Sequence, residues 1–291
     1  MINDQNQKYC DICGEGFTGV FYGKGSRYKI LQCPKCELLW SDPLTTQNFD
    51  KAIDSEYWAE DVYLKEESFQ KERFRKQLAG ILKLIPDIKI KKILDVGSGL
   101  GFFLDVCEEF GLQAEGCDIN HNAVEYCNKR KIRSRFGALD NFYDQNSFDM
   151  IFAFNLIEHL PHPKEFLLEC KRILRNEGSL IIETPTQNSL IHKFARLGDK
   201  LTGHRLNYYG VNPDGHIHKF SSKTFEILKD LGFEIELNEK INSPIREIIG
   251  KTSYLSTFNK YAVRFSIPLL WFLADLFGMQ NRVFVVLKLT K

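Results

Sequence analysis

Short apolar runs alternate with helical patterns from residue 91 onward. The runs with strand character are KKILDV (91–96), LQAEGCD (112–118), FDMIFAF (148–154) and SLIIETP (179–185). Between them, HNAVEYCNKR (121–130) and PKEFLLECKRIL (163–174) have helical spacing. This alternation is typical of βαβ units, in which helices cover both faces of a parallel sheet. The pattern therefore predicts a large α/β domain over residues 91–291.

The pattern also predicts the segments on either side of this core. SKTFEILKDLGF (222–233) predicts a helix, and EIELNE (234–239) and VFVVLKL (283–289) predict two late strands. Upstream, apolar residues such as Phe69, Phe74 and Leu78 recur at helical spacing until Pro86. We expect one or two amphipathic helices within a linker or lid over residues 43–90.

The first 42 residues carry two C-x-x-C pairs. Cys10 and Cys13 form the first pair, and Cys33 and Cys36 form the second. Two such knuckles at this spacing are typical of a zinc ribbon, in which four thiolates hold one tetrahedral ion. Because four thiolates leave no coordination position for a reacting water, we expect a structural zinc ion and not a catalytic one.

Charge and composition limit the choice of partners. Lys and Arg number 39 against 38 for Asp and Glu, so the formal charge of +1 gives no overall field that attracts nucleic acid. The N-terminal stretch has no apolar export segment, and the eight cysteines then read as thiols or metal ligands. We expect a cytoplasmic protein.

The stretch KKILDVGSGLGFFLDV (91–106) ends a predicted strand with Asp95 and then places glycines at 97, 99 and 101. Glycines at a strand-to-helix turn let a ligand approach main-chain amides. The spacing differs from the dinucleotide fingerprint G-x-G-x-x-G, and an acid beside the turn disfavours a diphosphate. A second acid, Asp118, follows the next strand. The two acids together predict a nucleoside that carries an ammonium group.

With these residues the chain resembles the class I S-adenosylmethionine-dependent methyltransferases. The resemblance rests on ILDVGSGLG, GCDIN, SFDMIFAFNLIEHLPHPKEFL and ILRNEGSLIIETP in this order. It implies a Rossmann-like, mostly parallel sheet of seven strands with an antiparallel last hairpin. It also implies S-adenosylmethionine as cofactor, bound by Asp95, Gly97, Ser98, Gly99, Gly101, Asp118, Ile119, Leu139 and Asn155.

Roles within that set follow from the same resemblance. Asp95 and the glycines would line the methionine side, Asp118 would hold the ribose, and Ile119 and Leu139 would flank the adenine. Asn155 would lie near the methionine carboxyl end. A purely structural alternative stays open at each place: the glycines can be ordinary turn residues, and Asp118 can be a helix N-cap.

The cysteine-rich head followed by this core resembles bacterial methyltransferases of polysaccharide and sugar biosynthesis. That resemblance implies a small hydroxylated acceptor, such as a sugar nucleotide or glycan precursor. A ribosomal-RNA methyltransferase with a zinc ribbon shares the same two parts. Residues 1–40 hold five basic residues against four acidic ones, and this small excess of positive charge does not favour binding to an RNA backbone. A non-catalytic scaffold on the same fold is the remaining alternative.

The candidate acceptor residues lie after the fourth and fifth strands. We expect an acceptor-side insertion at about 186–220, where DGHIHKFS offers His216 as a base for a hydroxyl proton. His159, in the family-like IEHLPHP, is the second catalytic candidate, although Glu158 and His159 can also simply shape a turn. His216 and His218 could ligate a second metal, but no third ligand is near in sequence.

Two further segments suggest contacts outside the core. Tyr57, Trp58 and Tyr63 could close over the cofactor or belong to the core. Residues 240–291 carry eight basic residues against two acidic ones and include SIPLLWFLADLF. This stretch could touch an anionic membrane surface, although the favoured alternative is a helix packed against the sheet.

Overall fold

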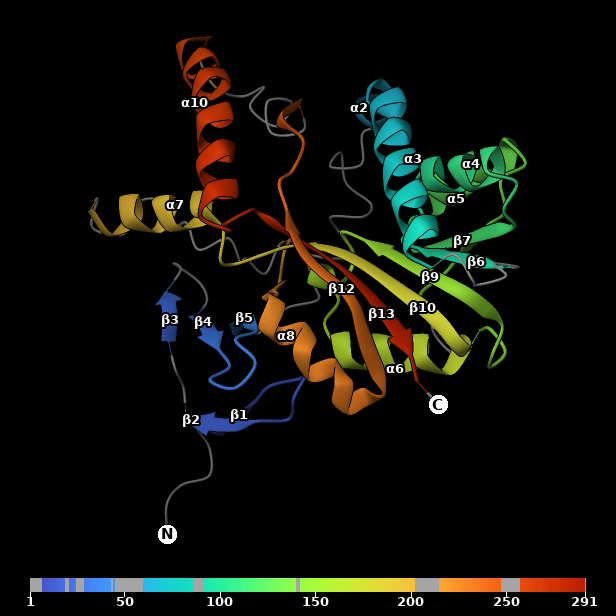
Figure 1. The fold of residues 1–291 in the computed structure, drawn as a ribbon, viewed down its shortest axis with the longest axis horizontal. Helices are drawn as coiled ribbons and strands as arrows, with labels where there is room; N and C mark the ends of the chain where they lie inside the picture. The colour runs from blue at the N-terminus through green and yellow to red at the C-terminus, as the bar shows by residue number, and fades with distance from the viewer. Residues whose placement is uncertain are drawn as a thin grey trace.

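A sheet of seven strands forms the centre of the chain, in the order β12-β13-β10-β9-β6-β7-β8 (Figure 1). The computed structural model describes residues 7–18, 21–24, 29–42, 44, 60–85, 92–139, 142–201, 215–246 and 257–290. The parallel strands are β6 (Ile93–Val96), β7 (Ala114–Asp118), β8 (Ser134–Phe136), β9 (Phe148–Phe154) and β10 (Leu174–Pro185). The antiparallel hairpin consists of β12 (Phe233–Ile241) and β13 (Arg282–Leu289). The predicted seven-stranded, mostly parallel fold is confirmed.

Side chains that alternate along the central strands build a core on each face of the sheet. Ile93 packs with Phe103 and Leu78 on the face covered by α3 (Glu67–Leu84) and α4 (Phe102–Glu109). Its neighbour Leu94 packs with Leu167 on the opposite face, covered by α6 (Pro163–Ile173) and α8 (Ser222–Glu226). Helix α5 (His121–Lys129) joins β7 to β8. Burial on both faces explains why these strands read as continuous apolar runs.

The helices expected before the sheet are present as α2 (Glu60–Lys65) and α3. Phe74 of α3 lies between Phe103 of α4 and Phe154 at the end of β9, with ring centroids 5.4 and 5.1 Å away. Aromatic edge contacts of this kind add to the burial of the rings. Helix α3 is therefore fastened to the end of the strand that leads into the candidate site.

The cysteine-rich head is joined to the acceptor side by a shared sheet. A hairpin of β1 (Gln7–Tyr9) and β2 (Gly16–Thr18) precedes β3 (Phe21–Lys24), β4 (Lys29–Gln32) and β5 (Leu39–Asp42). The second sheet has the order β11-β5-β4-β3, and its edge strand β11 (His218–Lys219) comes from the late part of the chain. His218 pairs with Trp40. The head and the main domain thus share one continuous hydrophobic core.

Two helices differ from the sequence-based expectation. The segment after Pro185, expected only as an acceptor-side insertion with no helix assigned to it, contains α7 (Leu190–Leu201). Large apolar residues recur at helical spacing in this segment, at Leu190, Phe194, Leu197 and Leu201. The polar residues between them obscured this helical pattern in the sequence. The second is α10 (Thr257–Leu276), which was expected to lie against the sheet.

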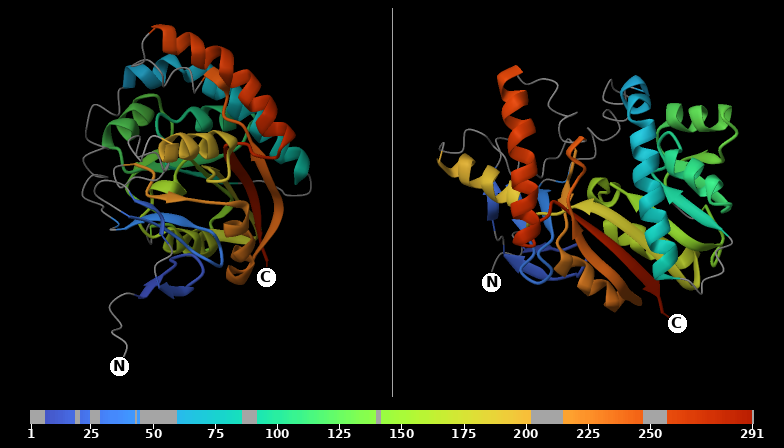
Figure 2. Two further views of the ribbon diagram at one scale, coloured as in Figure 1. Left: turned by 90° about the vertical axis from the view of Figure 1, so that its left-hand side faces the viewer. Right: turned by 45° about the horizontal axis from the view of Figure 1, so that its top comes forward.

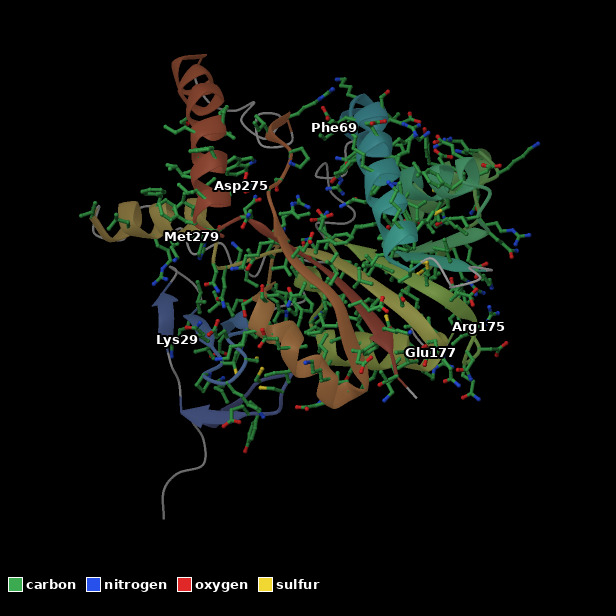
Figure 3. All side chains as sticks on the ribbon, viewed as in Figure 1. Lys29, Phe69, Arg175, Glu177, Asp275 and Met279 are labelled. Carbon is green, nitrogen blue, oxygen red and sulfur yellow. The ribbon has the colours of Figure 1, made fainter. Side chains whose placement is uncertain are left out.

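Helix α10 projects away from the sheet instead (Figures 1 and 2). Met279, labelled in Figure 3, accepts a hydrogen bond from the amide of Leu190 where α10 meets α7. Trp271 of α10 donates to the Ser243 carbonyl at 2.7 Å. The favoured expectation of packing on the sheet is wrong, because α10 packs on α7 and on the residues after β12.

Gly101, the N-cap of α4, provides a test of this packing. Its φ is +77°, and a Cβ added there would lie 2.9 Å from the Cys127 sulfur of α5. Gly101→Ala should therefore lower the free energy of unfolding by about 1–3 kcal/mol, because the left-handed backbone and the close contact both oppose a methyl group. Equilibrium denaturation in urea measures the change.

The matched control is Gly80→Ala in α3, where no atom lies within 4 Å of the added Cβ and φ is not positive. This variant should raise the free energy of unfolding by about 0.5–1 kcal/mol, because alanine favours a helix more than glycine does. Equal effects of the two substitutions would contradict the packing described for Gly101.

Candidate active site

Asp95 is the penultimate residue of β6 and is 3% exposed. Burial raises its pKa to about 8, and the Asp118 carboxylate adds to this shift. Among the described residues, no hydrogen-bond donor or cation contacts its carboxylate. An ionised buried carboxylate requires a positive or donating partner. The site therefore suits a ligand that brings a cationic donor to Asp95.

Asp118 ends β7, the strand that pairs in parallel with β6, two residues beyond the partner of Asp95. Its Oδ2 accepts from the Gly99 amide and its Oδ1 from the Asn120 amide, both at 2.8 Å. Asn120, not Asp118, is the N-cap of α5, since its side chain accepts from Ala123. A carboxylate has about four lone-pair positions, so Asp118 can still accept from hydroxyl groups of a ligand.

The other predicted cofactor residues have different surroundings. Ser98 points inward, with its hydroxyl 3.0 Å from that of Ser134, so only its backbone can face a ligand. Gly101 lies against Cys127, and Gly97 lies under Leu156, where an added Cβ would be 3.2 Å from Leu156 Cδ1. Ile119 and Leu139 are half-buried at the ends of β7 and β8, respectively. Their cofactor roles stay predictions.

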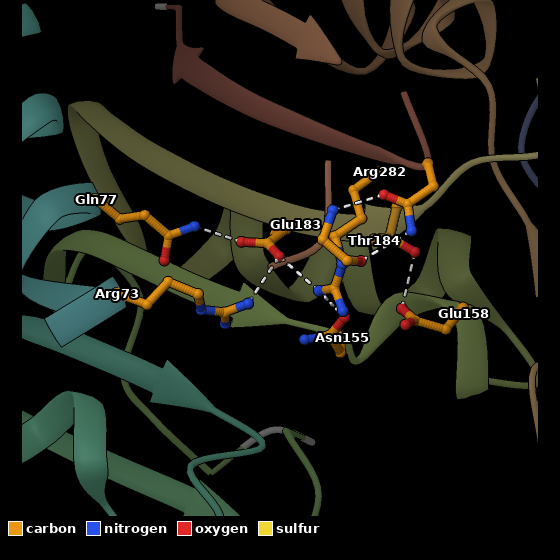
Figure 4. Close-up of polar contacts among 9 residues, drawn as sticks. Arg73, Gln77, Asn155, Glu158, Glu183, Thr184 and Arg282 are labelled. Atoms are coloured by element: carbon orange, nitrogen blue, oxygen red, sulfur yellow. Dashed lines mark hydrogen bonds and ion pairs between the residues drawn. The ribbon is translucent and has the colours of Figure 1, made fainter. Parts of the chain in front are cut away.

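Asn155 follows β9 with a φ of 51°, and a buried polar network holds it in this strained conformation. Its amide donates to the Glu183 carbonyl at 2.8 Å, and its Oδ1 accepts from Arg282 at 2.6 Å. Figure 4 shows Arg282, Arg73 and Gln77 meeting at the Glu183 carboxylate. The network ties α3, β10 and β13 to the turn after β9.

Glu158, His159 and His216 come together directly beyond that turn. Glu158 and His159 belong to the short helix η2 (Ile157–His159), which follows Leu156, the residue that covers Gly97. One ligating atom from each of the three residues lies within 4.8 Å of the others. The rings of His159 and His216 are nearly perpendicular at a centroid distance of 4.8 Å. The structure thus brings both catalytic candidates to one place.

His218 and Lys219 face the protein interior. Burial lowers the pKa of His218 to about 4, and burial lowers that of Lys219 to about 8. His218 is 1% exposed and pairs with Trp40 through β11. A neutral, buried imidazole in a strand is placed to support the sheet, and His216 is paired with His159, not with His218.

The four predicted metal ligands also form one cluster. The sulfur atoms of Cys10, Cys13, Cys33 and Cys36 lie within 4.8 Å of one another. In each knuckle the residue after the second cysteine has a positive φ, 69° at Gly14 and 64° at Glu37. Tetrahedral zinc thiolates require sulfurs about 3.8 Å apart at a metal–sulfur distance of about 2.3 Å. The cluster can therefore hold a tetrahedral metal ion.

Both knuckles contact the main domain. Asp11 accepts from the Lys164 amide at the N-terminus of α6 at 3.0 Å. The Cys36 carbonyl accepts from Thr224 of α8 at 2.9 Å, and the Glu37 carbonyl accepts from Gln187 at 2.6 Å. A metal at the cysteines would consequently fix the base of the segment that carries His216.

Some predicted residues cannot be placed. Tyr57 and Trp58 lie outside the described residues. Tyr63, the third aromatic residue of that group, is on α2 and 41% exposed. Residues 202–214 of the predicted insertion also lie outside the described residues. Thr186 and Phe220 join the two ends of that insertion, with the Thr186 hydroxyl donating to the Phe220 carbonyl at 3.0 Å.

Comparison with known proteins decides the family. A family model described as a methyltransferase domain matches residues 69–238, more than half of the chain. The chain belongs to the methyltransferase domain family. The ubiquinone biosynthesis O-methyltransferase of Idiomarina loihiensis is 27% identical over 171 residues, which are 55% of this chain and 68% of that protein. A probable S-adenosylmethionine-dependent methyltransferase of Mycobacterium tuberculosis is 28% identical over 39% of this chain and 43% of its own length.

The solved structures agree at the level of fold. A SAM-dependent methyltransferase from Archaeoglobus fulgidus matches with a TM-score of 0.50 and 19% identity, over 78% of this chain and 98% of that one. The predictions of the fold and of an S-adenosylmethionine-dependent methyltransferase are therefore confirmed. In the described part of this methyltransferase, no helix is long and apolar enough to cross a membrane.

Proposed function

We propose that the protein transfers a methyl group from S-adenosylmethionine to a hydroxyl group of a small acceptor, a sugar nucleotide or glycan precursor. The observation that carries the cofactor side is Asp95, a buried carboxylate whose described electrostatic neighbour is another carboxylate. The ammonium group of the cofactor supplies the charge that this position lacks. The name of the Idiomarina relative, an O-methyltransferase, favours oxygen as the methylated atom.

In this proposal Asp95 accepts from the methionine ammonium, and Asp118 accepts from the ribose hydroxyls while it holds the Gly99 amide. The backbone of Gly97, Ser98 and Gly99 lines the methionine moiety, and Ile119 and Leu139 cover the adenine. Gly101 serves by letting α4 approach α5. Asn155 keeps its Nδ2 as a donor because its Oδ1 is bound to Arg282.

The acceptor would lie between the cofactor and the cluster of Glu158, His159 and His216. Leu156 connects the two places, since it covers Gly97 and directly precedes η2. Methyl transfer needs the acceptor oxygen in line with the methyl–sulfur bond and a means of removing its proton. The cluster of Glu158, His159 and His216 assists that proton loss, and alignment of the reactants supplies most of the rate.

The raised pKa of Asp95 gives the cofactor proposal a distinctive pH dependence. Below about pH 8 the free protein holds a proton on Asp95 that the ammonium must displace. S-adenosylmethionine affinity should therefore rise by up to about tenfold per pH unit from pH 6 to 8 and then level off. Calorimetry in two buffers of different ionisation enthalpy should show a proton released on binding.

Asp95→Asn should weaken binding at pH 8.5 by at least about tenfold, because a hydrogen bond between charged groups is worth about 1.5–3 kcal/mol. It should also remove the pH dependence. Glu125→Gln, on an exposed face of α5, is the control and should change neither. Uptake of a nicotinamide dinucleotide with none of S-adenosylmethionine or its demethylated product would refute the proposal.

We also propose that the cysteine cluster holds one structural zinc ion. The support is the all-thiolate donor set, the matching knuckle geometry and the burial of Cys10, Cys33 and Cys36. The ion would fix the β5 end of the small sheet, and through β11 the position of His216.

Removal of this zinc should destabilise the protein. Cys33→Ser should purify with less than one zinc per chain and lose at least about 3 kcal/mol of stability, a fraction of the roughly 10–16 kcal/mol for zinc binding by isolated fingers. Cys107→Ser, a buried cysteine of the main core, should keep its zinc. Elemental analysis and thermal denaturation check both variants, and a full-length protein that folds equally well without metal would contradict the assignment.

The exposed apolar surface of α7 and α10 favours a lipid-linked acceptor. Phe194, Leu197 and Leu201 on α7 are 52–78% exposed, and Leu269, Phe272 and Leu276 on α10 are 62–65% exposed. Both sets have the i, i+3, i+7 spacing of one helix face. Residues 240–291 carry an excess of basic residues, 8 − 2 = +6. We propose that this face contacts an anionic bilayer surface.

Co-sedimentation with vesicles tests this contact. The protein should partition onto phosphatidylglycerol-containing vesicles more strongly than onto neutral phosphatidylcholine vesicles. The double variant Phe272→Ser and Leu276→Ser should partition at least about tenfold less, because each large apolar side chain contributes about 1.5–3 kcal/mol when buried. Leu168→Ser, exposed on α6, is the control. Equal partitioning of all three proteins would contradict the contact.

A further inference from the structure

Glu158 is a fully buried carboxylate with one oxygen in use. Its side chain has no exposed surface, and its Oε2 accepts from the Thr184 hydroxyl at 2.8 Å (Figure 4). Its Oε1 is buried and has no hydrogen-bond partner among the described residues. Leaving a buried acceptor unsatisfied costs about 1–3 kcal/mol, and more when it is charged. A missing partner at Oε1 is therefore the simplest explanation of this arrangement.

The two histidines beside Glu158 present nitrogen atoms to the same place. The three ligating atoms lie within 4.8 Å of one another. His159 Nδ1 is 3.0 Å from the Gly215 carbonyl, which can only accept, so this nitrogen carries the hydrogen. Nε2 is then the ring nitrogen of His159 that can act as a metal ligand. Metal-binding histidines commonly donate their second ring N–H to a backbone carbonyl in this way.

The supporting contacts fix each donor from a different element. Thr184 of β10 orients Glu158, and the Gly215 carbonyl orients His159. Gly215 directly precedes His216 in the chain. The ends of the segment that carries His216 are held together by the pair of Thr186 and Phe220. A carboxylate and two imidazoles with such second contacts form a typical open site for a divalent transition metal.

We propose that Glu158, His159 and His216 bind one divalent transition-metal ion that is separate from the cysteine cluster. Three protein ligands leave coordination positions for an acceptor hydroxyl, and bound cations lower the pKa of a coordinated oxygen. This role rests on the proposed methyl transfer. The acceptor O–H proton leaves to solvent, and the oxygen–carbon bond forms as the methyl–sulfur bond breaks. The sulfonium thereby becomes a neutral thioether.

Cobalt titration of the zinc-loaded, full-length protein tests the site directly. Co²⁺ should bind with one additional equivalent and give the weak visible bands of a nitrogen and oxygen site, without sulfur charge-transfer absorption. Glu158→Gln, His159→Ala and His216→Ala should each weaken this binding at least tenfold. His162→Ala, an exposed histidine three residues beyond His159, should leave it unchanged.

Two further measurements separate the outcomes. Zinc content and circular dichroism show that each variant is folded, and calorimetry with S-adenosylmethionine shows whether the cofactor site is intact. Cofactor binding without a second equivalent of Co²⁺ would overturn the metal site and leave the methyl-transfer proposal standing. Co²⁺ binding without cofactor uptake would support the metal site and overturn the methyl-transfer proposal. Co²⁺ binding that all three variants retain would also overturn the metal site.

Discussion

Two buried carboxylates on adjacent parallel strands determine the electrostatics of the turn that follows β6. Asp95 is the penultimate residue of β6 and Asp118 is the last residue of β7, and burial raises the pKa of both. Asp118 is compensated by the amides of Gly99 and Asn120, whereas Asp95 has no described donor. The uncompensated acid makes the turn a poor place for a diphosphate and a good one for an ammonium group. One electrostatic asymmetry thus separates this loop from dinucleotide-binding loops that share the strand-turn-helix geometry.

Most strands of the central sheet could be predicted because the apolar pattern that produces each strand lies within one short stretch of sequence. The strands β6, β7, β9, β10, β12 and β13 each carry a continuous or alternating apolar run, and burial on two faces leaves little choice of structure. The two C-x-x-C pairs were equally visible, because four ligands must converge if one metal is to hold them. The three-residue strand β8 was not visible, since so short a run has no period.

The acceptor side could not be predicted because its contacts are non-local. Pairing of His218 with Trp40 joins segments far apart in sequence and depends on two residues in β11. The cluster of Glu158, His159 and His216 likewise spans two segments. The sequence showed His216 and His218 as an obvious H-x-H pair, but only His218 belongs to β11, where it is buried, whereas His216 precedes the strand and its ring contacts His159. The side chains that lie beside His216, Glu158 and His159, come from η2 and not from its own segment.

The buried network around Glu183 explains how these distant segments keep a common geometry. Glu183 accepts from Arg282 of β13 and from Arg73 and Gln77 of α3, and the same arginine holds Asn155. The next residue of β10, Thr184, orients Glu158. Because successive residues of a strand point to opposite faces, β10 fastens α3 on one side and the histidine cluster on the other. Two neighbouring side chains of β10 therefore hold α3 and Glu158 in a fixed relation to each other.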